Sequence, residues 1–309
     1  MADTVLEVHK LVKNYGSFRA VDEISFSVPQ GKTIGFLGPN GAGKTTTIQI
    51  LLGLTLPSAG QIFYFGKDFS NYRCECLQKI NSASAFNTLL ERMTVKENLL
   101  VFAGLYDVSN SESKIKSLLD QFEIPDLRDT PYRSLSTGQK TRVNIVKSLL
   151  NDPEILLMDE PTASLDPDIA DKTLTLIEDL RRIRELSILY TSHNMEEITR
   201  ICDEVIFLDH GKIVAQDTPL GLTKRIPSVQ VQITIDTGRE QIELYLQEKK
   251  HEYTFSKPHV MIAQVEESMI PKFIFGIGKT GATITDIEIR KPNLEDIFLQ
   301  IARGPSHVA

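Results

Sequence analysis

Positions 33 to 47 of this chain carry the sequence Thr33-Ile34-Gly35-Phe36-Leu37-Gly38-Pro39-Asn40-Gly41-Ala42-Gly43-Lys44-Thr45-Thr46-Thr47. A short apolar run ends at Leu37, a glycine-rich turn follows, and an apolar-periodic segment begins at Lys44. The order strand, loop, helix with G-x-x-x-x-G-K-[ST] at the junction is typical of a P-loop. Its glycines let consecutive backbone N–H groups face inward, and the helix adds the positive end of its dipole. The stretch therefore predicts a binding site for the phosphates of a nucleotide.

Two side chains of this loop have distinct expected roles. Lys44 supplies a positive charge to the outer phosphates, and the hydroxyl of Thr45 is placed to bind Mg²⁺. The remaining nucleotide-binding positions of the loop are expected to be Gly38, Asn40, Gly41, Ala42, Gly43 and Thr46.

Composition limits the class of protein. The 309 residues are enough for two domains, and 41% hydrophobic with 24% charged residues describes an ordinary globular chain. Because 34 basic and 41 acidic residues give a net charge of −7, no broad electrostatic binding to nucleic acid is expected. No apolar run approaches 18 residues, and the N-terminus has no signal-like segment. We therefore expect a cytoplasmic protein whose membrane role, if any, comes through a partner.

Three cysteines, Cys74, Cys76 and Cys202, form no disulfide framework and fit a reducing compartment. The pair Cys74-Glu75-Cys76 has two interpretations, a metal site or an incidental spacing. Because no second cluster accompanies it, the incidental interpretation is favoured.

Residues 5–37 predict short strands at 5–8, 18–21, 24–28 and 33–37, separated by turn signals. The first of these are expected to form an antiparallel layer beside the P-loop strand. Tyr15 precedes a glycine turn, where its ring can stack on a purine or can belong to the core.

Residues 86–150 predict a helical insert between two α/β segments. Leu135-Ser136-Thr137-Gly138-Gln139 lies near its end and precedes a helix. Ser136 is a good N-cap, and Gly138 leaves an exposed amide at the helix start. This is a second possible phosphate site, although such a sequence alone is usually only a cap.

Residues 154–161 contain a continuous apolar run that ends in Asp159-Glu160 and predicts a buried parallel strand. Carboxylates at the carboxyl end of such a strand lie where open α/β sheets bind ligands. Asp159 is suited to hold Mg²⁺ through water, and Glu160 to polarise an attacking water. Asp166 follows in Ser164-Leu165-Asp166, and His193 comes just after another strand, within reach of a terminal phosphate.

Together these segments resemble the ATP-binding subunit of ABC transporters over roughly residues 4–222. The resemblance implies an α/β P-loop ATPase fold with an antiparallel layer and a helical insert, binding ATP and Mg²⁺. In its terms, 38–46 is similar to Walker A, 135–139 to the signature, and 155–160 to Walker B. Glu160 is then the catalytic carboxylate, His193 the switch histidine, Asp166 the D-loop acid, and Tyr15 the residue that stacks on adenine.

One family motif is missing. A glutamine is expected about nine residues before the segment 94–99, but Ser82-Ala83-Ser84-Ala85-Phe86-Asn87-Thr88 contains none. Asn87 can substitute as a shorter amide, or Ser84 can act through water.

The chain has one P-loop and one signature segment, so a phosphate held by both requires either intramolecular closure or a second chain. The resemblance implies a head-to-tail homodimer in which Ser136, Thr137, Gly138 and Gln139 act on ATP held by the other copy.

A different pattern begins after residues 223–228, which we expect to be a linker following a nucleotide-binding domain of residues 1–222. Residues 229–309 predict the order βαββαβ, a small ferredoxin-like α+β domain, and a final helical turn or two. This tail resembles extensions of ATPases that serve separate export permeases. Dimer stabilisation is the favoured role, ahead of a structural cap and of ligand sensing.

The sequence thus predicts an ATPase at the cytoplasmic face of the inner membrane, driving export through an integral-membrane permease on another chain, with no nucleic-acid partner. The alternative is an ABC ATPase acting on ribosomes or nucleic acid.

Overall fold

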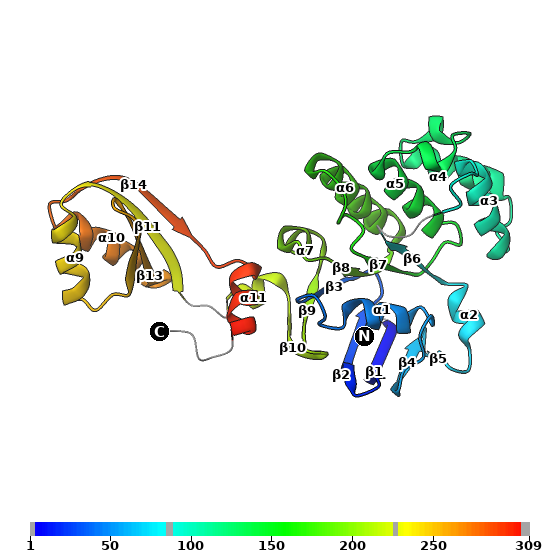
Figure 1. Ribbon diagram of the computed structural model, residues 1–309, viewed down its shortest axis with the longest axis horizontal. Coiled ribbons are helices and arrows are strands. Elements are labelled where there is room, and N and C mark those ends of the chain that lie inside the picture. The colour runs from blue at the N-terminus through cyan, green and yellow to red at the C-terminus, as the bar shows by residue number, and fades with distance from the viewer. Residues whose placement is uncertain (1–3, 85–88, 225–227, 304–309) are drawn as a thin grey trace. The chain divides into compact units, whose positions relative to one another are not determined.

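The computed structural model describes residues 4–84, 89–224 and 228–303 (Figure 1). The chain divides into two compact units, Met1–Pro219 and Leu220–Ala309. The three ranges include the P-loop, both carboxylates, His193 and the signature segment, whereas Asn87 lies outside them.

An antiparallel sheet forms one layer of the first unit, as predicted. Its order is β2-β1-β4-β5, from β1 (Thr4–Tyr15), β2 (Phe18–Pro29), β4 (Ala59–Tyr64) and β5 (Lys67–Asp68). The prediction of separate strands at 18–21 and 24–28 was wrong. Glu23 has a φ of 55°, and the pairing with β1 shifts register at this point, so β2 continues through an irregularity.

A six-stranded sheet carries the P-loop. Its order is β10-β9-β3-β8-β7-β6, from β3 (Thr33–Leu37), β6 (Ile80–Ser84), β7 (Ile155–Asp159), β8 (Ser187–Thr191), β9 (Glu204–Asp209) and β10 (Lys212–Asp217). All pairs are parallel except β9 with β10. Strands β3 and β8 are buried at every position, which explains the apolar runs at 34–37 and 188–190 within them.

Helices complete the first unit, with α3, α4 and α5 grouped away from the antiparallel sheet (Figure 1). They are α1 (Lys44–Leu51), α2 (Arg73–Leu77), α3 (Val95–Leu105), α4 (Ser111–Gln121), α5 (Thr137–Ser148), α6 (Pro167–Arg184) and α7 (Met195–Ile201), with 3-10 turns at Pro125–Leu127 and Tyr132–Ser134. The short helix α8 (Pro219–Thr223) spans the division between the two units. One apolar cluster runs from β1 and β2 through α1 to β3, β7 and β8. The core therefore fixes the P-loop helix against both sheets.

The second unit has the predicted βαββαβ order. It comprises β11 (Ser228–Thr237), α9 (Arg239–Glu248), β12 (Tyr253–Lys257), β13 (Val260–Glu266), α10 (Ile270–Gly278) and β14 (Thr283–Arg290), followed by α11 (Leu294–Arg303). The sheet order is β12-β13-β11-β14, with every pair antiparallel. Alternate residues of β11 are buried and pack with Ile242 and Phe273 of the two helices. Among all the residues described, no helix has the length and apolar character needed to cross a bilayer.

Candidate functional site: the carboxyl edge of the parallel sheet

The P-loop lies at the carboxyl end of β3 and has the curled backbone predicted for it. Gly38, Gly41 and Gly43 have φ values of 155°, 83° and 102°, in the region that favours glycine. A Cβ on Gly38 would lie 2.2 Å from the carbonyl oxygen of Leu208, and one on Gly43 would lie 2.5 Å from that of Ala20. The loop is therefore pressed against its neighbours where side chains cannot fit, and this fixes its shape.

Lys44 is the first residue of α1 and is only 6% exposed. Its Nζ donates to the carbonyl oxygens of Gly38, at 2.6 Å, and Pro39, at 3.2 Å. Burial lowers the pKa of this ammonium, and the nearby carboxylates of Glu160 and Asp159 oppose that shift. A buried cation held by neutral carbonyls inside an anion-binding loop is suited to receive phosphate.

The carboxylates are positioned by strand register. Asp159 ends β7, directly opposite Thr191 of β8 and Ser84 of β6, so all three lie at one edge of the sheet. The Thr191 hydroxyl donates to Asp159 Oδ1 at 2.6 Å and also accepts from the backbone N–H of Glu160 at 3.0 Å. One hydroxyl thus orients both members of the acidic pair.

Glu160 and His193 meet just beyond this edge. Glu160 has a φ of 47°, which turns the chain sharply after the strand. Its Oε2 lies 3.4 Å from Nδ1 of His193, whose side chain is 64% exposed, against 21% for Glu160. The structure therefore brings these two predicted residues together, with the histidine accessible to a ligand.

The signature segment and the D-loop acid also lie together. Ser136 caps α5 through a capping box: its Oγ accepts from Gln139 N, and Gln139 Oε1 accepts from Ser136 N. A cavity of about 770 Å³ is lined by Ser136, Thr137, Gly138, Gln139, Arg142, Ser164, Leu165, Asp166 and Ile169, together with residues of the segment 123–127. The P-loop contributes none of the lining that the structure describes. The predicted site residues therefore form two groups within one chain. One contains the P-loop, the acidic pair and His193, and the other contains the signature segment and Asp166.

Two further predictions concern Tyr15 and the missing glutamine. Tyr15 is 48% exposed, with Lys13 Nζ 4.9 Å from its ring centre, so the core interpretation was wrong. Asn87 lies outside the described residues, whereas Ser84 ends β6, a strand that the sequence analysis did not predict.

The sequence analysis missed the residues that support the site, namely Thr191 and a buried acid, Glu197. Glu197 is 6% exposed and accepts hydrogen bonds from three hydroxyl groups. A signal was present: Asn194 followed by Glu197 has the spacing of a helix N-cap with an acid three residues later.

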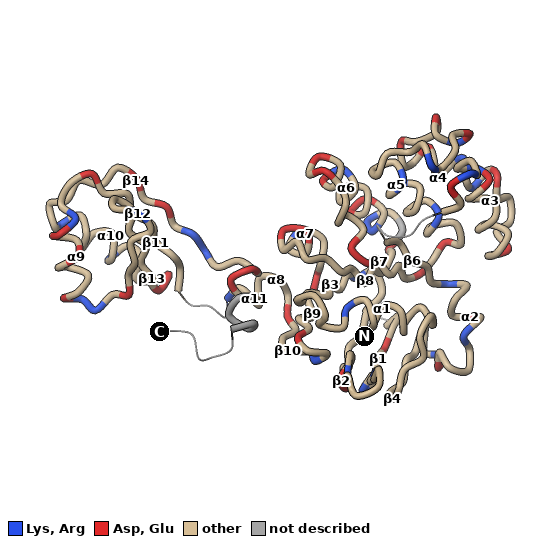
Figure 2. Tube along the Cα trace, in the orientation of Figure 1, with Lys and Arg blue, Asp and Glu red and all other residues tan. Residues whose placement is uncertain are grey.

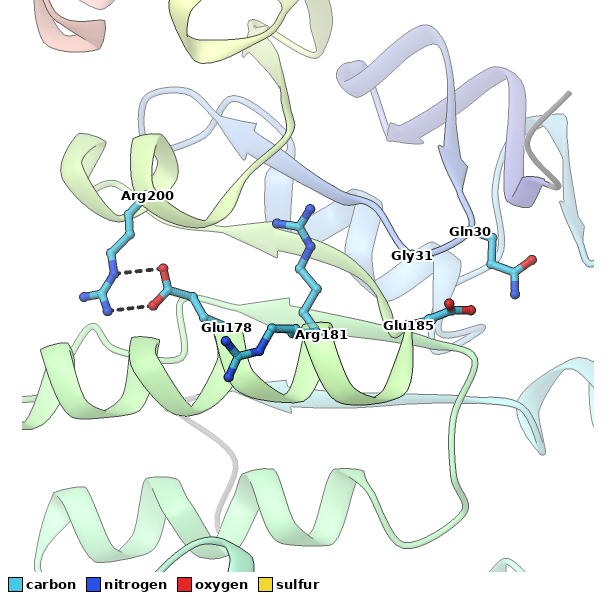
Figure 3. Close-up of a pocket in the computed structure, with 7 residues that line it drawn as sticks. Gln30, Gly31, Glu178, Arg181, Glu185 and Arg200 are labelled. Atoms are coloured by element: carbon cyan, nitrogen blue, oxygen red, sulfur yellow. Dashed lines mark hydrogen bonds and ion pairs between the residues drawn. The ribbon is translucent and has the colours of Figure 1, made fainter.

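A second cavity, of about 650 Å³, includes Gln30 and Gly31 from the turn before β3, away from the P-loop (Figure 3). Its arginines are engaged within the protein. Arg200 pairs with Glu178, as Figure 3 shows. Arg181 pairs with Asp203, and Arg182 pairs with Asp179. These partners neutralise the positive charges of the arginines. The cavity therefore lacks the excess positive charge expected of a phosphate-binding site.

A P-loop, a buried lysine and an acidic pair with a histidine at one edge of a parallel sheet define a nucleotide triphosphatase site. Comparison with known proteins agrees. Residues 21–163 match the family model described as ABC transporter. The Nod factor export ATP-binding protein I of Ralstonia nicotianae is 33% identical over 312 residues, covering 96% of this chain and 93% of that protein.

Two further relatives extend the comparison. The bacitracin transport ATP-binding protein BcrA of Bacillus licheniformis is 30% identical, covering 97% of this chain and 98% of that protein. The solved structure of CbiO1 from Clostridium perfringens, part of the ABC transporter complex CbiONQ, is similar with a TM-score of 0.65 and 26% identity. It covers 72% of this chain and 91% of that one. This chain belongs to the ABC transporter family as an ATP-binding protein, and it is an ATPase.

Proposed function

We propose that this chain hydrolyses ATP with Glu160 as general base and uses the energy to drive export through a separate membrane permease. The observation that carries the catalytic assignment is the 3.4 Å contact between Glu160 and His193 beside the buried Lys44. Glu160 accepts a proton from the attacking water, and His193 holds the water and the terminal phosphate in line. Tyr15, exposed at the end of β1, stacks on adenine.

Magnesium fits the donor set at this edge. Mg²⁺ prefers hard oxygen ligands, and the Thr45 hydroxyl is exposed while Asp159 keeps one carboxylate oxygen beyond the hydrogen bond from Thr191. Thr45 would hold the ion directly, and Asp159 through water. When bound, the ion neutralises charge on the outer phosphates.

The proposed active unit is a homodimer. The signature residues line a cavity with the D-loop and not with the P-loop of the same chain, so a second copy is needed to bring Ser136 and Gly138 onto ATP. Ser136 supplies a hydroxyl, and the N-terminus of α5 supplies backbone N–H groups.

The proposed partner is an integral-membrane permease, and the proposed location is the cytoplasmic face of the inner membrane. The name of the Nod factor export protein supports transport out of the cell, and that of the bacitracin transport protein supports a role in transport. Basic and acidic residues are interspersed along the chain in Figure 2, and the net charge is −7, so neither observation favours nucleic acid as the partner.

Mixing two inactive variants tests the dimer. Lys44→Ala removes the P-loop cation, and Ser136→Arg blocks the signature. A mixed dimer restores one site, built from the intact P-loop of the Ser136→Arg copy and the intact signature of the Lys44→Ala copy. We therefore expect ATPase activity to return on mixing. A mixture as inactive as its components would contradict a shared site.

Affinity purification from detergent-solubilised membranes of the producing cell tests the partner. We expect a protein with several membrane spans to co-purify with the Glu160→Gln variant in Mg-ATP. Recovery of ribosomes or nucleic acid in its place would favour the alternative function.

A further inference from the structure

Glu197, in the first turn of α7, is a buried carboxylate that binds only hydroxyl groups among the contacts the structure describes. Thr162 Oγ1 lies 2.9 and 2.8 Å from its two oxygens, Tyr190 Oη lies 2.9 Å from Oε2, and Ser192 Oγ lies 2.8 Å from Oε2. An ionised carboxylate only accepts, so all three hydroxyls must donate to it. Burying such a charge is costly without hydrogen bonds, and here they are provided.

Two features of the surroundings support these hydrogen bonds. Glu197 is the third residue of α7, where the helix dipole favours negative charge. Burial, followed by the charge of Glu197, raises the pKa of the Tyr190 phenol, which keeps that hydroxyl protonated and donating.

The three hydroxyls come from the segments that carry the catalytic pair. Thr162 lies two residues after Glu160, and Ser192 directly precedes His193. Ser192 Oγ also accepts from the backbone N–H of Asn194 at 3.0 Å, so the residues on both sides of His193 are fixed. The Glu197 carboxylate thus links the segment that carries Glu160 to the segment that carries His193 through hydrogen bonds.

We propose that Glu197 is a positioning residue that sets the distance between Glu160 and His193 by holding Thr162 and Ser192 on one carboxylate. The proposal rests on the catalytic roles assigned above to Glu160 and His193. Glu197 lines the same cavity of about 380 Å³ as Glu160 and His193, but the proposal requires no contact between Glu197 and substrate.

The other attachment of α7 provides a contrast. Arg200, in its last turn, binds Asp171, Thr175 and Glu178 of α6. These contacts hold α7 against α6 without involving the segments of Glu160 or His193. A variant of Arg200 should weaken the packing of α7 without changing the positions of Glu160 and His193. It therefore serves as a control for effects that come only from loss of packing.

Charge removal is the first test. Glu197→Gln keeps the shape but leaves one acceptor oxygen for three donors, so the turnover number should fall about 10-fold while the KM for ATP stays unchanged. The matched control is Glu196→Gln, an exposed acid one residue away, which should keep the wild-type turnover. Arg200→Met should lower the melting temperature but keep the turnover number. Equal turnover in Glu197→Gln and wild type would overturn the proposal.

A second pair of variants avoids changing a charge. Thr162→Val removes the hydroxyl at constant shape, and Thr162→Ser retains it. Turnover should fall several-fold in the first and return to near wild type in the second. If both variants lose the same activity, packing and not the hydroxyl is responsible.

Combining variants separates this proposal from the catalytic assignment. If Glu197 acts through the pair of Glu160 and His193, the loss caused by Glu197→Gln should be smaller in the Glu160→Gln background than in wild type. A further 10-fold loss in the double variant would show an independent role and overturn the positioning proposal. Wild-type activity of Glu160→Gln alone would instead overturn the assignment of Glu160.

Discussion

The two edges of the parallel sheet use the same types of charged residue in opposite ways. At the amino edge, Lys79 pairs with Glu154 at 2.8 Å, and both side chains are about half exposed. At the carboxyl edge, Lys44 is buried and donates to carbonyl oxygens, while Asp159 accepts from a hydroxyl. At the amino edge the lysine and the glutamate neutralise each other's charge. At the carboxyl edge the lysine and the aspartate do not pair with each other, so both remain available to bind a ligand. A charged cluster therefore becomes a site when the backbone and hydroxyl groups, and not opposite charges, supply its hydrogen bonds.

The largest expected difference compares the glutamates at the two ends of β7. Glu160 follows the strand and Glu154 precedes it. Glu160→Gln removes the proposed general base, so the ATP turnover number should fall about 10²–10⁴-fold. Glu154→Gln, at the paired edge, should remain within about twofold of wild type. Similar losses in both variants would show that the edges do not differ in function.

A buried lysine outside the site shows the cost of such an arrangement. Lys147 of α5 is 7% exposed and donates to Ser82 O at 2.9 Å and to Asn81 Oδ1 at 3.4 Å. Burial lowers its pKa from 10.5 to about 8. Between these values the unfolded chain binds the proton that the folded chain has lost, so this residue makes stability rise with pH.

The measurement is the free energy of unfolding of wild type and Lys147→Met from pH 7 to 10.5. As the pH rises above about 8, the free energy of unfolding of wild type should increase relative to that of the variant, by at most about 3 kcal/mol. Taking the difference between the two proteins removes the titration of all other groups. A constant difference would show that Lys147 titrates normally.

A smaller effect is expected where the P-loop backbone is constrained. Gly43→Ala places a side chain at a φ of 102° and 2.5 Å from the Ala20 carbonyl oxygen. Because the added side chain clashes with this carbonyl, we expect the free loop of the variant to leave its curled shape. ATP binding must then restore a positive φ that costs about 1–2 kcal/mol, so the affinity for ATP should fall at least roughly 5–30-fold. Gly66→Ala, with a φ of 74° and open space, is the control: it should lower stability and leave ATP affinity unchanged. Isothermal titration calorimetry with a non-hydrolysable ATP analogue measures the affinity of the two variants.

The smallest effect is expected at the amino edge itself. Lys79→Met breaks the exposed pair with Glu154, and such pairs contribute about 0–1 kcal/mol. Chemical denaturation should show a loss within that range, with unchanged ATPase activity. A loss of more than about 2 kcal/mol would mean that pairs at this edge stabilise the fold as strongly as buried ones.

The sequence predicted the shape of the loop and the position of the acidic pair Asp159-Glu160 because local patterns encode them. G-x-x-x-x-G-K-T fixes a strand, a turn and a helix start together, and the apolar run before Asp159-Glu160 requires a buried strand. These features depend on residues adjacent in the chain. The βαββαβ order of the second unit was predictable for the same reason, since β11 alternates strictly between buried and partly exposed positions along Val229–Ile235.

The roles of the supporting residues could not be predicted, because these roles depend on contacts between distant segments. Thr191 acts on Asp159 through the register of two parallel strands. Glu197 is one of two adjacent acids, and only packing buries it while Glu196 stays exposed. Strand β6 was missed because Asn81 and Ser82 interrupt its apolar character, and its position beside β7 is a tertiary property.

The central claim is that ATP is held at the carboxyl edge of the sheet, in a site that a second copy of the chain completes. The direct measurement is the mass of the purified Glu160→Gln variant in solution, by sedimentation with and without Mg-ATP. We expect twice the mass of one chain, with two ATP molecules retained, only when Mg-ATP is present. A single chain at saturating Mg-ATP, or a dimer that forms without nucleotide, would contradict it.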